Sequence, residues 1–264
     1  MTGVQPAATS VDLAGSSARV WSLGSGDAVG YLAGIGGLPR WPQVLDQLAT
    51  QRRVVAPSLP GFPGGAVFRQ LDSQLDWLLA ARDLLVASGL EGADLVGVSI
   101  GAALAADVAA VWPGLVRRLV LISPLGVFDE RQPTADIFAQ PPGQLGRLLC
   151  ADGTRFDEHV TVADGGDPVE WSVQSVRAME SAARLLWPLG DTGLASRLER
   201  IPCPALLLFG SDDRVLPAGM RDVFAQAIAG SRVQVVQRAG HLVDLDDPET
   251  VAGLILDHID AAGH

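Results

Sequence analysis

The sequence contains no lysine and no asparagine, so all 19 of its basic residues are arginine. Without lysine the chain cannot form a Schiff base, a Ser–Lys hydrolase dyad or the lysine-bearing phosphate loop of many nucleotide-binding proteins. Without asparagine it has no N-glycosylation site and no Cys–His–Asn triad. These two absences exclude several classes of enzyme before any motif is considered.

Cysteine is scarce as well, with only Cys150 and Cys203. Two cysteines make neither a disulfide framework nor a metal cluster, so we expect two free thiols. The acidic run of Asp244, Asp246, Asp247 and Glu249 is typical of an exposed helix start rather than of a metal site. We therefore expect no metal and no cofactor.

Hydrophobic segments of membrane length and a signal peptide are also lacking, which favours a cytoplasmic protein with no membrane partner. The formal net charge is −11, with 30 acidic residues, and an acidic surface argues against nucleic-acid binding. A small-molecule substrate is the expected partner, and the sequence carries no signal for an oligomeric state. With 264 residues, 48% of them hydrophobic, the chain can bury one large core.

Short apolar runs alternate with helical patterns along most of the chain. The first two runs join at Gly15–Ser16, which indicates a hairpin. The alternation predicts an α/β fold with a mostly parallel, eight-stranded sheet and helices on both faces. The expected strands are 9–14, 17–22, 28–33, 53–57, 94–98, 119–123, 204–210 and 232–237, and the expected helices are 42–49, 72–88, 100–111 and 248–262.

The alternation stops over residues 127–200, where no run resembles a strand. Segments 133–150 and 168–190 have helical patterns, with a Gly/Asp-rich stretch between them. We interpret 127–200 as a helical insertion after the sixth strand. The remaining residues, 1–126 and 201–264, would then form one α/β core.

A G-x-S-x-G pattern over residues 97–101 places Ser99 where the fifth expected strand ends and an apolar helix begins. The pentapeptide alone is a weak signal, but this position is the one that a nucleophile elbow needs. The serine adopts a strained turn there, so the residues two before and two after it must be small. The amide of Ile100 is then one donor to an oxyanion, assisted by the helix dipole.

His241 is the best placed of the four histidines to act as the base for Ser99. It follows the last expected strand, at the sheet edge where sites of α/β proteins assemble, and it comes after the serine in the chain. His159 lies in a polar part of the insertion, and His258 lies on the final helix. Two candidate acids, Asp212 and Asp213, follow the seventh strand, and position alone does not choose between them.

Further motifs resemble those of the α/β-hydrolase superfamily over nearly all of the chain outside 127–200. They are Gly210, Asp213 and Pro217 in a G-x-x-D-x-x-x-P pattern; Gly240, His241, Asp246 and Pro248 in a G-H pattern followed by an acid and a proline; 41–48 in W-P-x-V-x-x-x-L; and 56–62 in A-P-x-x-P-G-F. The resemblance implies that Asp213 is the acid. It also implies that the amide of Ile35 is the second oxyanion donor, although Ala33 stands where the family usually has histidine.

The resemblance, to capped members with a serine nucleophile, also implies a function. The expected enzyme is a serine hydrolase that cleaves a small carboxylic ester or lactone through a Ser-Asp-His triad and an acyl-enzyme. A carbon–carbon bond hydrolase of meta-cleavage-type diketones is the nearest alternative, and a non-hydrolytic lyase or cyclase is another. The insertion resembles the cap of such enzymes. Its aromatic and thioether side chains would line the substrate pocket or pack the cap helices together: Phe138, Trp171, Met179 and Trp187.

Overall fold

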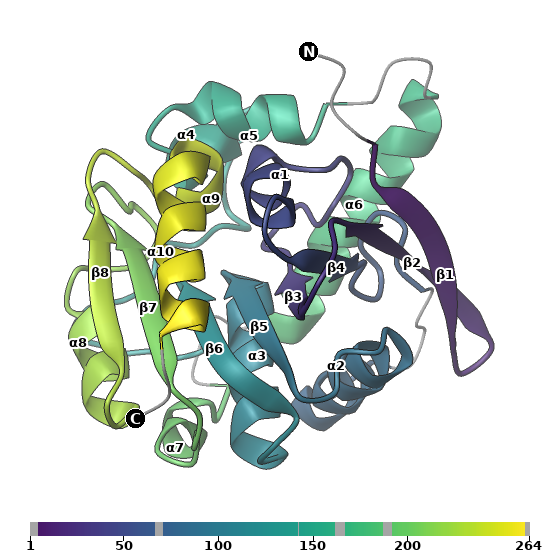
Figure 1. The fold of residues 1–264 in the computed structure, drawn as a ribbon. Coiled ribbons are helices and arrows are strands. Elements are labelled where there is room, and N and C mark those ends of the chain that lie inside the picture. The colour runs from purple at the N-terminus through teal and green to yellow at the C-terminus, as the bar shows by residue number, and fades with distance from the viewer. Residues whose placement is uncertain (1–4, 67–70, 142, 162–166, 187–191, 262–264) are drawn as a thin grey trace.

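An eight-stranded sheet forms the centre of the computed structural model, which describes residues 5–66, 71–141, 143–161, 167–186 and 192–261 (Figure 1). The strand order is β1-β2-β4-β3-β5-β6-β7-β8, and β2 alone runs opposite to the other strands. The predicted α/β-hydrolase fold with a mostly parallel sheet is therefore confirmed. The strands are β1 Ala7–Leu13, β2 Ser16–Leu23, β3 Ala28–Leu32, β4 Arg53–Pro57, β5 Ala93–Val98, β6 Val116–Ile122, β7 Ala205–Gly210 and β8 Arg232–Val236.

The expected hairpin joins β1 to β2. Leu13 pairs with Ser16, so the loop holds only Ala14 and Gly15. Both loop residues have positive φ, 51° and 83°, as a two-residue hairpin turn with the twist of its strands requires. The antiparallel edge of the sheet thus follows from local turn geometry.

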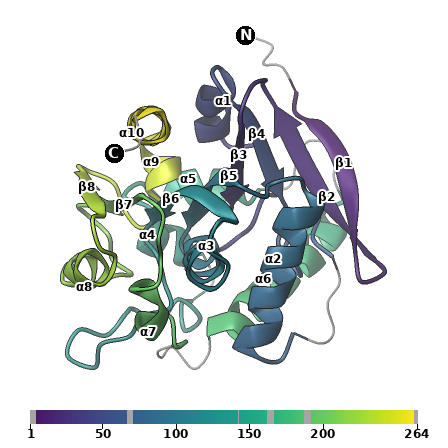
Figure 2. The same ribbon diagram turned by 60° about the horizontal axis from the view of Figure 1, so that its bottom comes forward.

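Helices cover both faces of the sheet. Figure 2 shows α1 (Gln43–Ala49) and α10 (Pro248–Asp260) over one face, and α2 (Gln74–Ala87), α3 (Ile100–Val111) and α8 (Met220–Ala227) over the other. The central strands are buried on both sides, which explains why they are nearly continuous apolar runs.

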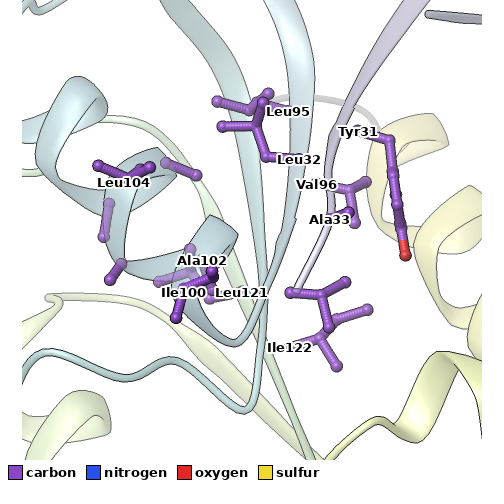
Figure 3. Packing of buried hydrophobic residues seen from close by; sticks show 14 of the residues in the cluster. Tyr31, Leu32, Ala33, Leu95, Val96, Ile100, Ala102, Leu104, Leu121 and Ile122 are labelled. Carbon is purple, nitrogen blue, oxygen red and sulfur yellow. The ribbon is translucent and has the colours of Figure 1, made fainter. Parts of the chain in front are cut away.

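The core beside the expected nucleophile is packed from β3, β5, β6 and α3. Figure 3 labels Leu32, Leu121 and Ile122 of the strands with Ile100 and Ala102 at the start of α3, and Leu121 lies next to Ile100 and Ala102. All five side chains are at most 2% exposed. Since such interiors are close-packed, this region holds the strand ends and the helix start rigidly.

The described residues between β6 and β7 form four helices: α4 Leu145–Leu149, α5 Gly153–His159, α6 Pro168–Leu186 and α7 Ala195–Leu198. The prediction of a helix over 133–150 was wrong except for the five residues of α4. Asp136 Oδ1 instead accepts hydrogen bonds from the amides of Phe138 and Ala139, a local turn that competes with a helix. Helix α5 was missed; its cap is Asp152, whose side chain accepts from the Thr154 amide.

Candidate active site

Ser99 lies between β5 and α3 with φ 53° and ψ −112°, a conformation that side chains other than glycine rarely adopt. Its amide donates to Ile122 O at 2.8 Å, which fixes the turn to the end of β6. A Cβ at Gly97 would lie 2.6 Å from Ala102 Cα, and one at Gly101 would lie 2.4 Å from Leu32 O. The two glycines are therefore required by close backbone contacts, as a nucleophile elbow predicts.

Ser99, His241 and Asp213 form one continuous hydrogen-bonded chain. Ser99 Oγ lies 2.8 Å from His241 Nε2, and His241 Nδ1 lies 3.0 Å from Asp213 Oδ2. An ionised carboxylate can only accept hydrogen bonds, so Nδ1 carries the proton and Nε2 accepts from the serine hydroxyl. This is the tautomer that a base for Ser99 needs.

The structure places Asp213, and not Asp212, against the imidazole; Asp212 is exposed and bonded to Ser211. Asp213 Oδ1 also accepts from the amides of Val215 and Leu216, at 2.8 and 2.9 Å. Burial alone would raise the pKa of Asp213, but the charge and hydrogen bond of His241, with these amides, hold it below its usual value. The carboxylate therefore stays ionised beside the imidazole.

The loop after β3 lies next to the serine. A Cβ at Gly34 would lie 3.2 Å from the Ser99 Cβ, so the loop passes beside the nucleophile at this residue. Ile35 is the next residue of the same loop. Among the described residues, the amides of Ile35 and Ile100 donate no hydrogen bond. Buried amides seldom lack an acceptor, so two free donors beside a serine suit a developing oxyanion.

Helix α5 braces this loop from the insertion. His159, 8% exposed, has its Nε2 3.1 Å from Gly37 O, and Phe156 and Val160 contact Gly36. Burial is the main reason that the pKa of His159 lies below its usual value. The polar sequence around His159 did not predict a buried side chain, because the contact joins residues 122 positions apart.

Asp246, which appeared in the sequence only as the acid of the G-H motif, and Arg214, which no motif included, hold the loops of the site together. Asp246 Oδ2 accepts from the amides of Gly240 and Ala151, at 2.7 and 2.8 Å. Arg214 donates to the carbonyl oxygens of Arg147 and Cys150. The end of α4 is thus tied both to the loop of the base and to the loop of the acid. In Figure 1, α4, α5 and α9 (Val243–Asp246) lie together beyond the ends of β7 and β8.

The structure describes three of the four residues that the sequence placed in a substrate pocket or among the packed cap helices. Phe138 and Met179 are half-buried and pack against the core, and Trp171 is half-buried on α6. Trp187 lies outside the described residues. Their role in substrate binding stays a prediction.

Ser99 and His241 are both 0% exposed, so the site is closed to solvent in this structure. A cavity of about 720 Å³ lies between α6 and the segment after β4, with Phe62, Trp77, Arg177 and Arg184 in its lining.

No group of side chains able to hold a metal ion occurs in the part of the chain that the structure describes. Both cysteines are free. No helix within the described ranges is long and apolar enough to cross a membrane.

The fold and a serine–histidine–aspartate chain at the strand ends define the class of the α/β hydrolases. A family model described as the alpha/beta hydrolase family matches residues 14–254, and the chain belongs to this family. Its relatives are hydrolases, and this chain is a hydrolase of the same family.

Two curated relatives illustrate the range of the family. The chain is 29% identical over 239 residues to the 2-hydroxymuconate semialdehyde hydrolase of Pseudomonas sp. (strain CF600), covering 86% of this chain and 83% of that protein. It is 28% identical over 220 residues to the pimeloyl-(acyl-carrier protein) methyl ester esterase of Neisseria meningitidis, covering 78% and 68%.

Among solved structures, the chain is similar to the 2-hydroxy-6-oxo-6-phenylhexa-2,4-dienoate hydrolase from Rhodococcus sp. strain RHA1. The TM-score is 0.79 at 19% identity, and the match covers 98% of this chain and 100% of that one. At this identity the likeness concerns the fold.

Proposed function

We propose that the protein is a serine hydrolase that cleaves a small-molecule carboxylic ester or lactone through an acyl-enzyme. The observation that carries this proposal is the hydrogen-bonded chain from Ser99 through His241 to Asp213. It supplies a nucleophile, a base in the required tautomer and an ionised group that stabilises the imidazolium.

The reaction takes two steps at Ser99. The serine Oγ attacks the carbonyl carbon while His241 Nε2 takes its proton, and the oxyanion accepts from the amides of Ile35 and Ile100. The imidazolium returns the proton to the leaving alkoxide, and the acyl group remains on Oγ. Water then attacks the acyl carbon with His241 as its base, the acyl–Oγ bond breaks as the imidazolium returns this proton to Ser99 Oγ, and the acid is released. One oxyanion donor of this kind contributes about 3 kcal/mol to transition-state stabilisation.

A carbon–carbon bond hydrolase of meta-cleavage-type diketones is the second candidate. The similarity to a 2-hydroxymuconate semialdehyde hydrolase favours it, and the similarity to a methyl ester esterase favours the first. The two reactions differ in the leaving group. An alkoxide needs one proton, which the imidazolium supplies, whereas a carbon leaving group must also be stabilised as it departs. The triad and the two free amides support each step of the ester reaction, so we rank it first.

We also propose that residues 127–200 act as a cap over this site, with 1–126 and 201–264 as the core. Three contacts support this assignment: α5 packs on the loop of Ile35, the Leu149 carbonyl at the end of α4 accepts from the Leu242 amide next to His241, and Arg197 of α7 pairs with Asp107 of α3 at 2.6 Å. Because the serine is enclosed, substrate entry requires the cap or a loop to move. A moving cap would exclude water during acyl transfer.

The decisive test compares wild type with Ser99→Ala on a panel of activated esters, lactones and vinylogous diketones. We expect Ser99→Ala to lose turnover of the preferred substrate and to lose labelling by a fluorophosphonate probe, since both need the serine Oγ. An undiminished rate in Ser99→Ala would refute the assignment. Cleavage of the diketones with no cleavage of any ester would select the second candidate.

A further inference from the structure

A buried tyrosine–aspartate pair lies behind the base. Tyr31 of β3 donates from Oη to Asp244 Oδ2 at 2.6 Å, and the two side chains belong to residues only 2% and 3% exposed. Figure 3 shows the Tyr31 ring extending toward the helices of the C-terminal segment. The expectation that Asp244 belongs to an exposed acidic helix start was therefore wrong. The short helix α9 turns this side chain inward, against the sheet.

Only one of the two carboxylate oxygens of Asp244 accepts a hydrogen bond from another side chain. Its Oδ1 has no hydrogen-bond partner among the described residues. Burial is the main cause that raises its pKa to about 6, so the carboxyl is largely ionised at neutral pH. Burial, and then the charge of Asp244, raise the pKa of Tyr31 well above its usual value, so the phenol keeps its proton and donates. A buried carboxylate with one unpaired oxygen costs stability, and native proteins concentrate such groups at functional sites.

The titratable and charged groups near Asp244 come from its own loop, from α4 and α5, and from the residues that line a hollow beside it. His241 lies three residues earlier in the chain, and its charge favours the ionised form of the Asp244 carboxyl. Asp246 is on the same short helix, and the Cys150 thiol lies at the end of α4. A hollow of about 160 Å³ beside Asp244 is also lined by Arg40, Arg155, Glu158 and His159. Of these groups, His241 is the one whose charge changes during the proposed reaction.

We propose that Asp244 is a positioning residue whose buried charge, held in place by Tyr31, stabilises the protonated form of His241. The inference rests on the proposed function. Asp213 meets the imidazole directly at Nδ1, while Asp244 acts through space on the cation that forms when Ser99 gives up its proton. Tyr31 also stands in the strand that leads into the loop of Ile35, so the pair joins the base loop to the oxyanion loop.

Asp244→Asn tests the charge without changing the shape, because the amide oxygen can still accept from Tyr31. Measured as kcat/KM against pH on an activated ester, the acid limb should move to lower pH by about half a unit or more. The plateau kcat should fall about three- to tenfold, since one pKa unit corresponds to a factor of ten, and KM should stay unchanged.

Tyr31→Phe provides an independent test in the same experiment. Loss of the hydroxyl removes a hydrogen bond that lowers the pKa of Asp244, so the charge should disappear at a higher pH than in wild type. This variant should resemble Asp244→Asn in weakly acidic solution and approach wild type in alkaline solution. A purely structural role for the pair predicts no such dependence on pH.

Asp257→Asn, on the exposed side of α10, removes the same charge away from the site and should leave the profile unchanged. Wild-type acid limbs in both Asp244→Asn and Tyr31→Phe would overturn the inference. A loss of kcat without any shift of the limb would also overturn it. Retained turnover in Ser99→Ala would instead refute the proposed function, so the two failures can be told apart.

Discussion

Gly101 and Gly253 both lie within helices, yet alanine should have opposite effects at the two positions. At Gly253, on α10, nothing lies within 4 Å of an added Cβ, so alanine gains about 1 kcal/mol of helix propensity. At Gly101, on α3, an added Cβ would lie 2.4 Å from Leu32 O and 2.5 Å from Ala33 O. Both neighbours are backbone atoms, so the segment that leads into the oxyanion loop must move.

The size of the effect follows from that overlap. Ordinary contacts between carbon and a carbonyl oxygen are about 3.3 Å, so the two carbonyls must move by most of an ångström. Overpacking costs about 1–3 kcal/mol, and rigid backbone favours the upper end; after the gain in propensity, we expect a net loss of about 2 kcal/mol. In a chain of this length that corresponds to a fall in Tm of about 4–8 °C, against a rise of about 2–4 °C for Gly253→Ala.

Activity should change with stability only at Gly101. The displaced segment carries Ile35, and loss of one oxyanion donor lowers kcat about 10²- to 10³-fold, so partial displacement should cost at least about tenfold. Thermal unfolding followed by circular dichroism and kcat on an activated ester measure both effects. A Gly101→Ala variant that unfolds at or above the wild-type temperature with unchanged kcat would refute the crowding argument.

Asp213→Asn should lower kcat about 10⁴-fold in steady-state assays, because an amide can hold the imidazole in the wrong tautomer, while Asp212→Asn should stay near wild type. A similar loss in both variants would contradict the assignment of Asp213. Burial raises the pKa of Asp244 from the ordinary aspartate value of 3.8 to about 6, so the folded protein binds this proton more tightly and loses stability as pH rises between these values. Asp244→Asn should therefore have a higher Tm than wild type at pH 7, and this difference should vanish near pH 4 in thermal unfolding; an equal difference at both pH values would count against it.

The sheet could be read from the sequence because its information is local. Each buried strand is a short apolar run, and the turn at Ala14 and Gly15 needs residues that tolerate positive φ. The helix at 100–111 was equally clear, because it is apolar almost all round and begins directly after Ser99. Such signals lie within a few residues of one another, so no knowledge of long-range contacts was needed.

The segment between β6 and β7 was harder to read for the opposite reason. Its amphipathic patterns are short, and Asp136 forms a turn where a helix was expected. The α5 helix has a capping signal at Asp152, but its buried face is defined by Phe156 and His159 against the loop after β3. Which polar residue turns inward depends on the surface that the helix meets.

The sequence by itself determined the α/β fold, the strained turn at Ser99 and the loop that carries His241, because each depends on a local pattern. Only the tertiary structure decided that Asp213 rather than Asp212 meets the imidazole, when position alone left both open. It alone also buried Asp244 against Tyr31, 213 residues away in the chain. Side-chain direction in a loop is set by packing across the sheet edge, and that packing exists only after distant strands have come together.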